Sequence, residues 1–385
     1  MPARIDSSLP AAASVAGVAG DRPIPVFKNV QALRAVAALL VVLLHMGLPD
    51  LGIDTMFADG HNWLAGFGLF GEFGVDVFFV ISGFVMLVST WNLIGTPKAG
   101  ATFFLRRAIR IYPPYWLALL PVLGIYFFAR TQFMRGHAVS LRDMFASLFL
   151  YPNPTAKLLH PVAWTLVYEM TFYVIFAIII SFNRRYLNLG IAVWACAQVL
   201  LFVAFARSSN PYLGYAAHTI PLEFLLGMLV GIAYVKGKLR LGRVIFSLGI
   251  LAAVAAWIGN PWPIMEQFEP ARLLFYGLPA ALLVYGAVAI ESNRGIVAPL
   301  WLVAAGNASY AVYLWHFLLI DGLHRLFVRL QLRGTLWHLG GEVAALATIL
   351  AVGALIFRFF ERPVTSRLNR ALKNLGRSRE TLARR

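Results

Sequence analysis

Charged residues are scarce in this sequence. Only 13% of the 385 residues are charged and 60% are hydrophobic, and the mean hydropathy is +0.73. Soluble proteins of this length contain about a quarter charged residues and about half apolar ones. The composition therefore excludes an ordinary soluble enzyme, a disordered chain and a fibrous protein, and it indicates a polytopic helical membrane protein.

Cysteine is almost absent, because Cys196 is the only one in the chain. A single thiol cannot form an intrachain disulfide, a zinc knuckle or a dithiol redox pair. The histidines are scattered, and none forms an i, i+4 pair on an apolar segment, so we expect no metal site. Cys196 has no polar neighbour in sequence, and we interpret it as inert packing.

Acidic residues are about half as numerous as basic ones, 17 against 33, which gives a net charge of +16. Most of the basic residues cluster between the apolar segments, where loops should lie. We therefore expect no nucleic-acid partner. We interpret the charge as the positive-inside signal of a multi-pass membrane protein, with the lipid bilayer as its environment.

Long apolar segments recur along the whole chain, and ten of them approach the roughly 20 residues that a membrane span needs. We predict an all-α integral membrane bundle of about ten transmembrane helices, with the N- and C-termini both cytoplasmic. The seventh segment is the shortest. The predicted spans are 31–48, 64–92, 103–128, 162–182, 187–206, 218–235, 244–259, 273–290, 302–328 and 339–360.

The domain organisation follows from these spans. Residues 1–27 are rich in Ala, Ser, Pro and Gly and indicate a flexible cytoplasmic leader. We expect residues 28–365 to form one membrane domain and residues 366–385 to form a basic cytoplasmic tail. The segment 141–151 is too short to span a membrane, so we expect it to lie in the interface or to re-enter beside the bundle.

Arg34 and His45 stand in the first expected span, where ionisable side chains are costly and suggest function. They are eleven residues apart, which is about three helical turns and about 16 Å, so they project from nearly the same face. Alone, Arg34 could be a snorkelling interfacial arginine and His45 a hydrogen-bonded core histidine. The pair on one stripe favours a functional site.

Among the other ionisable residues of the expected spans we single out three: Asp76, Glu169 and His316. The topology places all three, with His45, in the outer half of the bilayer. A carboxylate such as Glu169 or Asp76 could orient the imidazole of His45. We therefore predict His45, Glu169 and Asp76 as the catalytic set, with His316 in support.

Arg106, Arg107 and Arg110 form a cationic cluster at the beginning of the third expected span, at its predicted cytoplasmic mouth. A topology signal needs no such geometry, whereas guanidinium groups suit phosphate oxygens. We predict that these three arginines and Arg34 bind phosphate groups, although a topology signal remains the alternative. Other polar or aromatic residues near the expected site could contact a second substrate, the acceptor, or could support the catalytic residues. They are Ser82, Tyr115, Trp164, Tyr168, Tyr310 and His316.

Two of the small residues in the second span have a competing interpretation. Ser82 and Gly83 would let another helix approach closely, and we favour packing over chemistry for both.

The outer acid/base residues and the inner arginines suggest one polar shaft through the bundle. Such a shaft suits a ligand that is anionic at one end and reactive about 15–20 Å away. Acyl-coenzyme A has this shape. Its phosphates could stay at the inner arginines while the pantetheine arm carries a thioester towards His45. The histidine could then act as a base for an incoming hydroxyl or as a transient acyl carrier.

Six segments follow one another along the chain: Arg34 to His45, Phe78–Phe84, Arg106–Trp116, Trp164–Tyr173, Ser309–His316 and Glu361-Arg362-Pro363. In order and at matching spacings, they resemble acyltransferase family 3, the bacterial membrane O-acyltransferases that modify surface and exported glycans. The resemblance implies a place in the bacterial cytoplasmic (inner) membrane. The resemblance implies a cytoplasmic acetyl-CoA co-substrate, no permanently bound cofactor, and a hydroxyl acceptor on a glycan or lipid-linked glycan. It also implies that Arg34, His45 and the arginine cluster are essential. The activity that it suggests is exopolysaccharide O-acetylation, with polysaccharide biosynthesis or export machinery as possible partners.

Two alternatives to an enzyme remain open at this point. A transporter or flippase for a glycan or lipid-linked intermediate would use the polar shaft as its pathway, but it predicts broken helices in paired positions of two halves. The Pro113-Pro114 pair has no counterpart in the sequence. A non-catalytic scaffold of an export complex would leave the ionisable residues of the spans unexplained.

Overall fold

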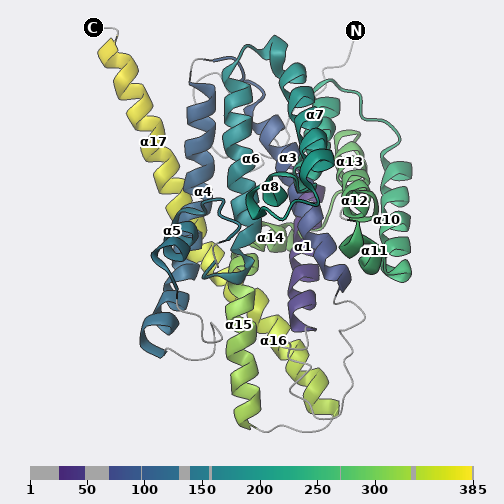
Figure 1. Cartoon of the computed structure of the whole chain (residues 1–385), viewed down its shortest axis with the longest axis vertical. Coiled ribbons are helices and arrows are strands. Elements are labelled where there is room, and N and C mark those ends of the chain that lie inside the picture. Colours follow the sequence, from purple (N-terminus) through teal and green to yellow (C-terminus); the bar gives the residue numbers. More distant parts are fainter. Residues whose placement is uncertain are drawn as a thin grey trace, which may run out of the picture.

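A computed structural model describes residues 26–47, 69–96, 98–129, 139–155, 158–268, 270–330 and 335–383 of the chain (Figure 1). The regular structure of these residues is entirely helical. Most of the expected leader, residues 1–25, and the last two residues of the expected tail lie outside the described residues.

The elements follow one another in a simple order. The α-helices are α1 (Lys28–Met46), α3 (Phe73–Thr90), α4 (Ala99–Gly124), α5 (Leu141–Phe149), α6 (Trp164–Ser181), α7 (Leu187–Phe205), α8 (Pro211–Ala216), α9 (Ile220–Val235), α10 (Gly242–Gly259), α11 (Trp262–Gln267), α12 (Pro270–Arg272), α13 (Leu278–Ser292), α14 (Leu300–Asn307), α15 (Ser309–Leu330), α16 (Thr335–Ile356) and α17 (Arg362–Ala383). The short 3-10 segments are η2 (Leu69–Glu72), η4 (Pro161–Ala163) and η5 (Arg184–Tyr186), and the π-helical turns are η3 (Ile125–Ala129), η6 (Leu273–Gly277) and η7 (Phe357–Glu361).

The number of membrane spans agrees with the sequence prediction. In the described part of the chain, nine helices are long and apolar enough to cross a membrane, and the number is ten if α14 and α15, which meet at a bend of 63°, are counted together as one span. The short seventh span is present as α10, with 18 residues. An all-α membrane bundle of about ten spans is thus confirmed, while the orientation of the termini stays a prediction.

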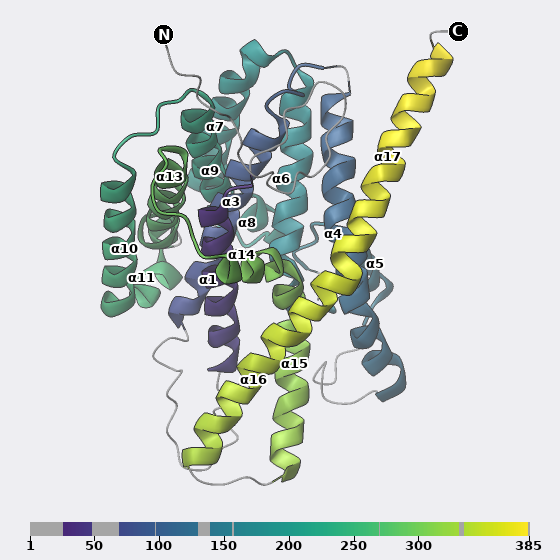
Figure 2. The same ribbon diagram turned by 180° about the vertical axis from the view of Figure 1, so that it is seen from behind.

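Helix α1 lies in the middle of the bundle (Figure 2). Ala37 and Val42 of α1 are fully buried. The end of α14 packs against the first turn of α1, because a Cβ atom built on Gly306 would lie 1.9 Å from the carbonyl oxygen of Gln31. Only glycine allows this approach, and it brings the bend between α14 and α15 beside the helix that carries Arg34 and His45.

Helices α3 and α9 touch through their backbones. A Cβ atom on Gly83 would lie 2.0 Å from the carbonyl oxygen of Phe224, and one on Gly227 would lie 1.9 Å from that of Val80. Small residues permit this kind of close packing between membrane helices. The packing role predicted for Gly83 is confirmed, whereas Ser82, next to it, points elsewhere.

Helix α4 begins at Ala99, earlier than the span expected from residue 103. The predicted arginine cluster therefore lies two to three turns after the start of the helix, and not at its mouth. Pro113, Pro114 and Pro121 are accommodated inside α4. This corrects the expected location of the cluster at the mouth of the span and moves it towards the centre of the bundle.

The short helix α5 lies beside α4, and its placement at the interface or re-entering the membrane stays a prediction. Three consecutive carbonyl groups at its end accept hydrogen bonds from aromatic residues midway along α4: Tyr115 donates to Ser147 (2.7 Å), Trp116 to Leu148 (2.9 Å) and Tyr112 to Phe149 (2.7 Å). These are carbonyls that a helix end cannot satisfy internally. The aromatic residues of α4 thus cap α5.

Helix α14 crosses the bundle, and α15 starts from its interior (Figure 2). The α15–α16 pair extends beyond the other helices on one side, and α17 continues α16 through η7 to the opposite side (Figures 1 and 2). The described part of the expected tail is therefore helical.

Candidate active site

A cavity of about 220 Å³ lies between α1, α3, α4, α6 and α15. Its wall combines arginine, glutamate and tyrosine side chains with apolar ones. The lining residues are Gln31, Arg34, Val75, Phe78, Phe79, Ile81, Ser82, Val85, Arg107, Arg110, Ile111, Thr165, Leu166, Glu169, Tyr173, Tyr310 and Tyr313. The cavity thus gathers six of the residues that the sequence singled out, from five different helices.

Three of the four predicted arginines line this cavity: Arg34, Arg107 and Arg110. Arg107 and Arg110 are three residues apart on α4 and therefore share a face, while Arg106 does not line the cavity. The Arg107 guanidinium donates to Ser89 Oγ at 3.0 Å and lies 5.6 Å from the ring centre of Tyr173. Its position is therefore fixed on two sides.

Glu169 sits among these arginines. Its Oε1 atom accepts hydrogen bonds from Ser82 Oγ (2.9 Å) and from the Tyr173 hydroxyl. It also interacts electrostatically with Arg34 and Arg107. Glu169 is thus a counter-charge of the arginines, and Ser82 orients it.

A second counter-charge comes from the far end of the chain. Glu361 closes η7, is 4% exposed and interacts electrostatically with Arg110 and Arg34. The chemical reading of the sequence missed this residue and included it only in the closing Glu-Arg-Pro segment. The sequence feature that could have identified Glu361 is its position, as an acidic residue directly after an apolar run and before a basic tail.

Two tyrosines of α15 close the cavity. The Tyr310 hydroxyl donates to the carbonyl oxygen of Ile111 at 3.1 Å. The Tyr313 hydroxyl donates to the carbonyl oxygen of Val162 at 2.9 Å and lies 2.6 Å from Thr165 Oγ1. Tyr313 lines the cavity and also contacts His316, so it stands between the arginines and the histidines.

His45 and His316 form a pair beyond Tyr313. Their ring centres are 4.8 Å apart, and Nε2 of His316 lies 3.3 Å from Nδ1 of His45. Nδ1 of His45 is 2.9 Å from the carbonyl oxygen of Val41, and Nδ1 of His316 is 2.6 Å from that of Tyr313. Carbonyl oxygens only accept, so we assign the proton to Nδ1 in both neutral rings. Nε2 of His45 then keeps a free lone pair.

This arrangement corrects the expectation that a carboxylate orients His45. The partners of its Nδ1 are a backbone carbonyl and the ring of His316, whereas Glu169 lies with the arginines. Asp76 is engaged elsewhere, because the Arg272 guanidinium donates to both of its oxygens at 3.0 and 2.9 Å. Arg272 also binds Glu72 at 2.8 Å. A buried carboxylate held in this way has an ion-pair role, and we leave Asp76 out of the catalytic set.

The remaining predicted residues lie outside the cavity lining. Tyr115 belongs to the cap of α5. Tyr168 stacks on Tyr215 with ring centres 4.5 Å apart, and Trp164 packs edge-on against Tyr168. These residues support the walls around α6 and do not face the arginines. In the part of the chain that the structure describes, no group of three His, Cys, Asp or Glu residues could hold a metal ion.

Comparisons with known proteins identify several similar proteins. The exopolysaccharide production protein ExoZ of Rhizobium meliloti (strain 1021) is 33% identical over 312 residues, which cover 77% of this chain and 90% of that protein. The acyltransferase MdmB of Streptomyces mycarofaciens is 26% identical, over 88% of this chain and 91% of that protein. Nodulation protein 10 of Rhizobium leguminosarum bv. viciae is 25% identical, over 77% of this chain and 83% of that protein.

No solved structure matches the chain. A family model described as an acyltransferase domain, Acyl_transf_3, matches residues 27–358, which is most of the membrane bundle and includes the cavity and the histidine pair. The chain is a multi-pass membrane protein that belongs to acyltransferase family 3.

Proposed function

We propose that this protein transfers an acyl group, in the simplest case acetyl, from cytoplasmic acyl-CoA to a hydroxyl group of an exopolysaccharide or a lipid-linked precursor of one. The observation that carries the proposal is the placement of three arginines in one cavity with a histidine pair directly behind its tyrosine wall. Acyl transfer from a nucleotide-bearing donor needs both features.

The arginines are suited to hold the donor. Arg107 and Arg110 present guanidinium groups from one face of α4, and Arg34 faces the same cavity from α1. Guanidinium groups bind phosphate through two parallel, charge-assisted hydrogen bonds. Glu169 and Glu361 balance these charges when no phosphate is bound, because buried charges without partners are costly.

The distance between the two parts suits the pantetheine arm. Arg34 and His45 are eleven residues apart on α1, which corresponds to about 16 Å along the helix axis. The arm would pass Phe78 and Tyr313, which face each other with ring centres 6.2 Å apart. The Tyr313 side chain would therefore have to move to admit the thioester.

His45 is suited to act as the base. Its free Nε2 atom would take the proton of the acceptor hydroxyl as that oxygen attacks the thioester carbon. The C–O bond forms, the C–S bond breaks, and the proton passes from Nε2 to the departing thiolate to give CoA thiol. His316 and the Val41 carbonyl would hold the imidazolium by accepting from its Nδ1–H.

The acceptor is inferred from relatives. ExoZ is named for exopolysaccharide production, and other similar proteins are named as putative O-acetyltransferases of Staphylococcus aureus. Sugar hydroxyls are weak nucleophiles at neutral pH and need a positioned base. Polysaccharide biosynthesis or export proteins are the partners expected for such an acceptor.

A transporter or flippase is the competing function, and the bend between α14 and α15 is the feature that favours it. Transporters built from repeats have broken helices at equivalent positions of both halves. Among the described residues, one helix pair is bent in this way. The unpaired break fits a transporter poorly.

The direct test is an assay with the purified full chain in nanodiscs, labelled acetyl-CoA and exopolysaccharide fragments. We expect release of free CoA thiol that depends on acceptor, together with label in the glycan. The variant His45→Ala should bind CoA but transfer nothing. Acceptor transport without release of CoA would overturn the enzyme proposal.

A further inference from the structure

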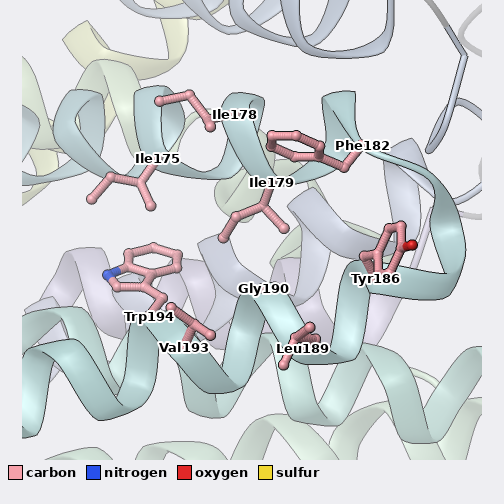
Figure 3. A pocket seen from close by; sticks show the side chains of 9 residues that line it. All are labelled: Ile175, Ile178, Ile179, Phe182, Tyr186, Leu189, Gly190, Val193 and Trp194. Carbon is pink, nitrogen blue, oxygen red and sulfur yellow. The ribbon is translucent and has the colours of Figure 1, made fainter.

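An apolar groove runs between α6 and α7, away from the active-site cavity (Figure 3). Figure 3 shows side chains from both helices facing each other across it, with Gly190 between them. A Cβ atom on Gly190 would lie 2.9 Å from Ile179, so the helices meet at this point and form the floor of the groove. The groove is lined by Ile175, Ile178, Ile179, Phe182, Leu189, Val193 and Trp194, with Tyr186 at one end.

The groove opens towards the surrounding bilayer. Ile178, Phe182 and Val193 are each between 57% and 60% exposed, and together they present only hydrocarbon. From Ile175 to Phe182 the groove follows α6 for about 10 Å. This length and width suit a stretch of one lipid acyl chain, which is the ligand that the hydrocarbon core supplies.

One end of the groove carries positive charge. The turn η5 connects α6 to α7 there, and the guanidinium of Arg185 lies 4.5 Å from the ring centre of Tyr186. Arg184 points the other way, because it stacks on Trp91 at 3.9 Å and donates to the Trp91 carbonyl oxygen at 2.6 Å. Arg185 is therefore the cation next to the groove.

We propose that this groove is a binding site for an anionic phospholipid, with one acyl chain between α6 and α7 and the headgroup phosphate at Arg185. Basic residues between membrane helices recognise anionic headgroups on the cytoplasmic side. Tyrosines favour the same boundary, since one end of the ring is apolar and the other polar. The bound lipid would stabilise the α6 face opposite Glu169 without entering the reaction.

The chain offers matched variants to test the site. Arg185 lies two residues before α7 and Arg207 two residues after it, and both are exposed. Val193 and Val203 are both exposed on α7, at 58% and 75%, but only Val193 lines the groove. The comparison therefore uses Arg185→Gln against Arg207→Gln, and Val193→Trp against Val203→Trp.

Native mass spectrometry of the full chain, titrated with phosphatidylglycerol or phosphatidylethanolamine in detergent, measures the binding. We expect preferential binding of phosphatidylglycerol. Arg185→Gln should weaken it about fivefold, the factor that corresponds to about 1 kcal/mol for one basic residue near an anionic headgroup. Val193→Trp should weaken both lipids by filling the groove, and the two control variants should bind as the unmodified chain does.

Three outcomes would overturn the site. Equal binding of the two lipids would mean that the groove has no headgroup preference. Equal loss in Arg185→Gln and Arg207→Gln would mean that a general surface charge is responsible. Undiminished binding by Val193→Trp would place the lipid elsewhere on the bundle.

Discussion

Nε2 of His316 lies 3.3 Å from Nδ1 of His45, and both rings are anchored through Nδ1 to carbonyl oxygens of their own helices. This relationship gives His316 a specific role. It accepts the Nδ1–H of His45 and so keeps the opposite nitrogen of His45 available. The proposed base His45 thus has a second, fully buried histidine as its side-chain partner, where catalytic histidines usually have a carboxylate.

The first prediction concerns His316. His316→Leu should lower kcat about tenfold, because a lost hydrogen bond of about 1.4 kcal/mol would loosen the base without removing it. His316→Gln should recover part of the rate, since its carbonyl oxygen can accept the same hydrogen. The measurement is kcat per folded molecule and its pH profile, with CoA affinity alongside. A uniform loss of folded protein with unchanged turnover per molecule would make His316 a packing residue.

The second prediction uses the neighbouring arginines of α4. Arg107 lines the cavity and Arg106 does not. Arg107→Gln should weaken acyl-CoA binding by roughly tenfold to a hundredfold, as expected for the loss of hydrogen bonds to a charged group. Arg106→Gln should stay within about twofold, and Arg107→Lys should recover binding only in part because it lacks the planar fork. Isothermal titration with desulfo-CoA measures this. Equal effects of the two Gln variants would contradict specific phosphate binding.

The sequence predicted the span count and the residue types of the cavity because both depend on local composition. Ten apolar runs of span length, and arginines within or next to them, are visible without any knowledge of contacts. The spacing from Arg34 to His45 is equally local, since helical rise fixes it. The sequence alone could therefore predict which residues share one face of a helix.

Contacts between side chains of helices that are far apart in the sequence could not be predicted from it. Glu169 could join either the histidines or the arginines, and only packing of α6 against α3 and α4 decided for the arginines. Asp76 needed a cationic partner, but nothing in the sequence pointed to Arg272, 196 residues away. The role of Glu361 depends on how α16 and η7 return to the bundle.

The third prediction concerns Glu361. Glu361→Gln removes a negative charge beside Arg34 and Arg110, so CoA should bind several-fold more tightly and its release should slow. A favourable change of about 1 kcal/mol would correspond to about fivefold. Glu361→Asp is the control that keeps the charge. Equilibrium binding and burst kinetics distinguish the effects, and weaker CoA binding in Glu361→Gln would mean that the carboxylate positions the arginines instead.

The fourth prediction concerns orientation. The turn between α9 and α10 contains Lys236 and Lys238, and the positive-inside rule places it in the cytoplasm. A phosphatase fusion after Lys238 should be inactive, whereas one after Pro261, beyond α10, should be active. The reverse pattern would put the arginine cavity on the wrong side for cytoplasmic acyl-CoA.

The last prediction separates an ion-pair role of Asp76 from a catalytic one. Asp76 is fully buried and its carboxylate is held side-on by Arg272, which also binds Glu72. Removing one member of a buried pair leaves an uncompensated charge and costs about 3–5 kcal/mol. Asp76→Asn and Arg272→Gln should each lower the melting temperature in detergent, and the double variant should be more stable than the sum of the two losses predicts.

Turnover per folded molecule distinguishes the ion-pair role of Asp76 from a catalytic role. If Asp76 only joins α3 to the segment at Arg272, the surviving Asp76→Asn molecules should transfer acyl groups at nearly the normal rate and with an unchanged pH profile. A base or an orienting carboxylate would behave differently, because its loss lowers kcat by orders of magnitude in correctly folded protein. An inactive Asp76→Asn variant with a normal melting temperature would return Asp76 to the catalytic set.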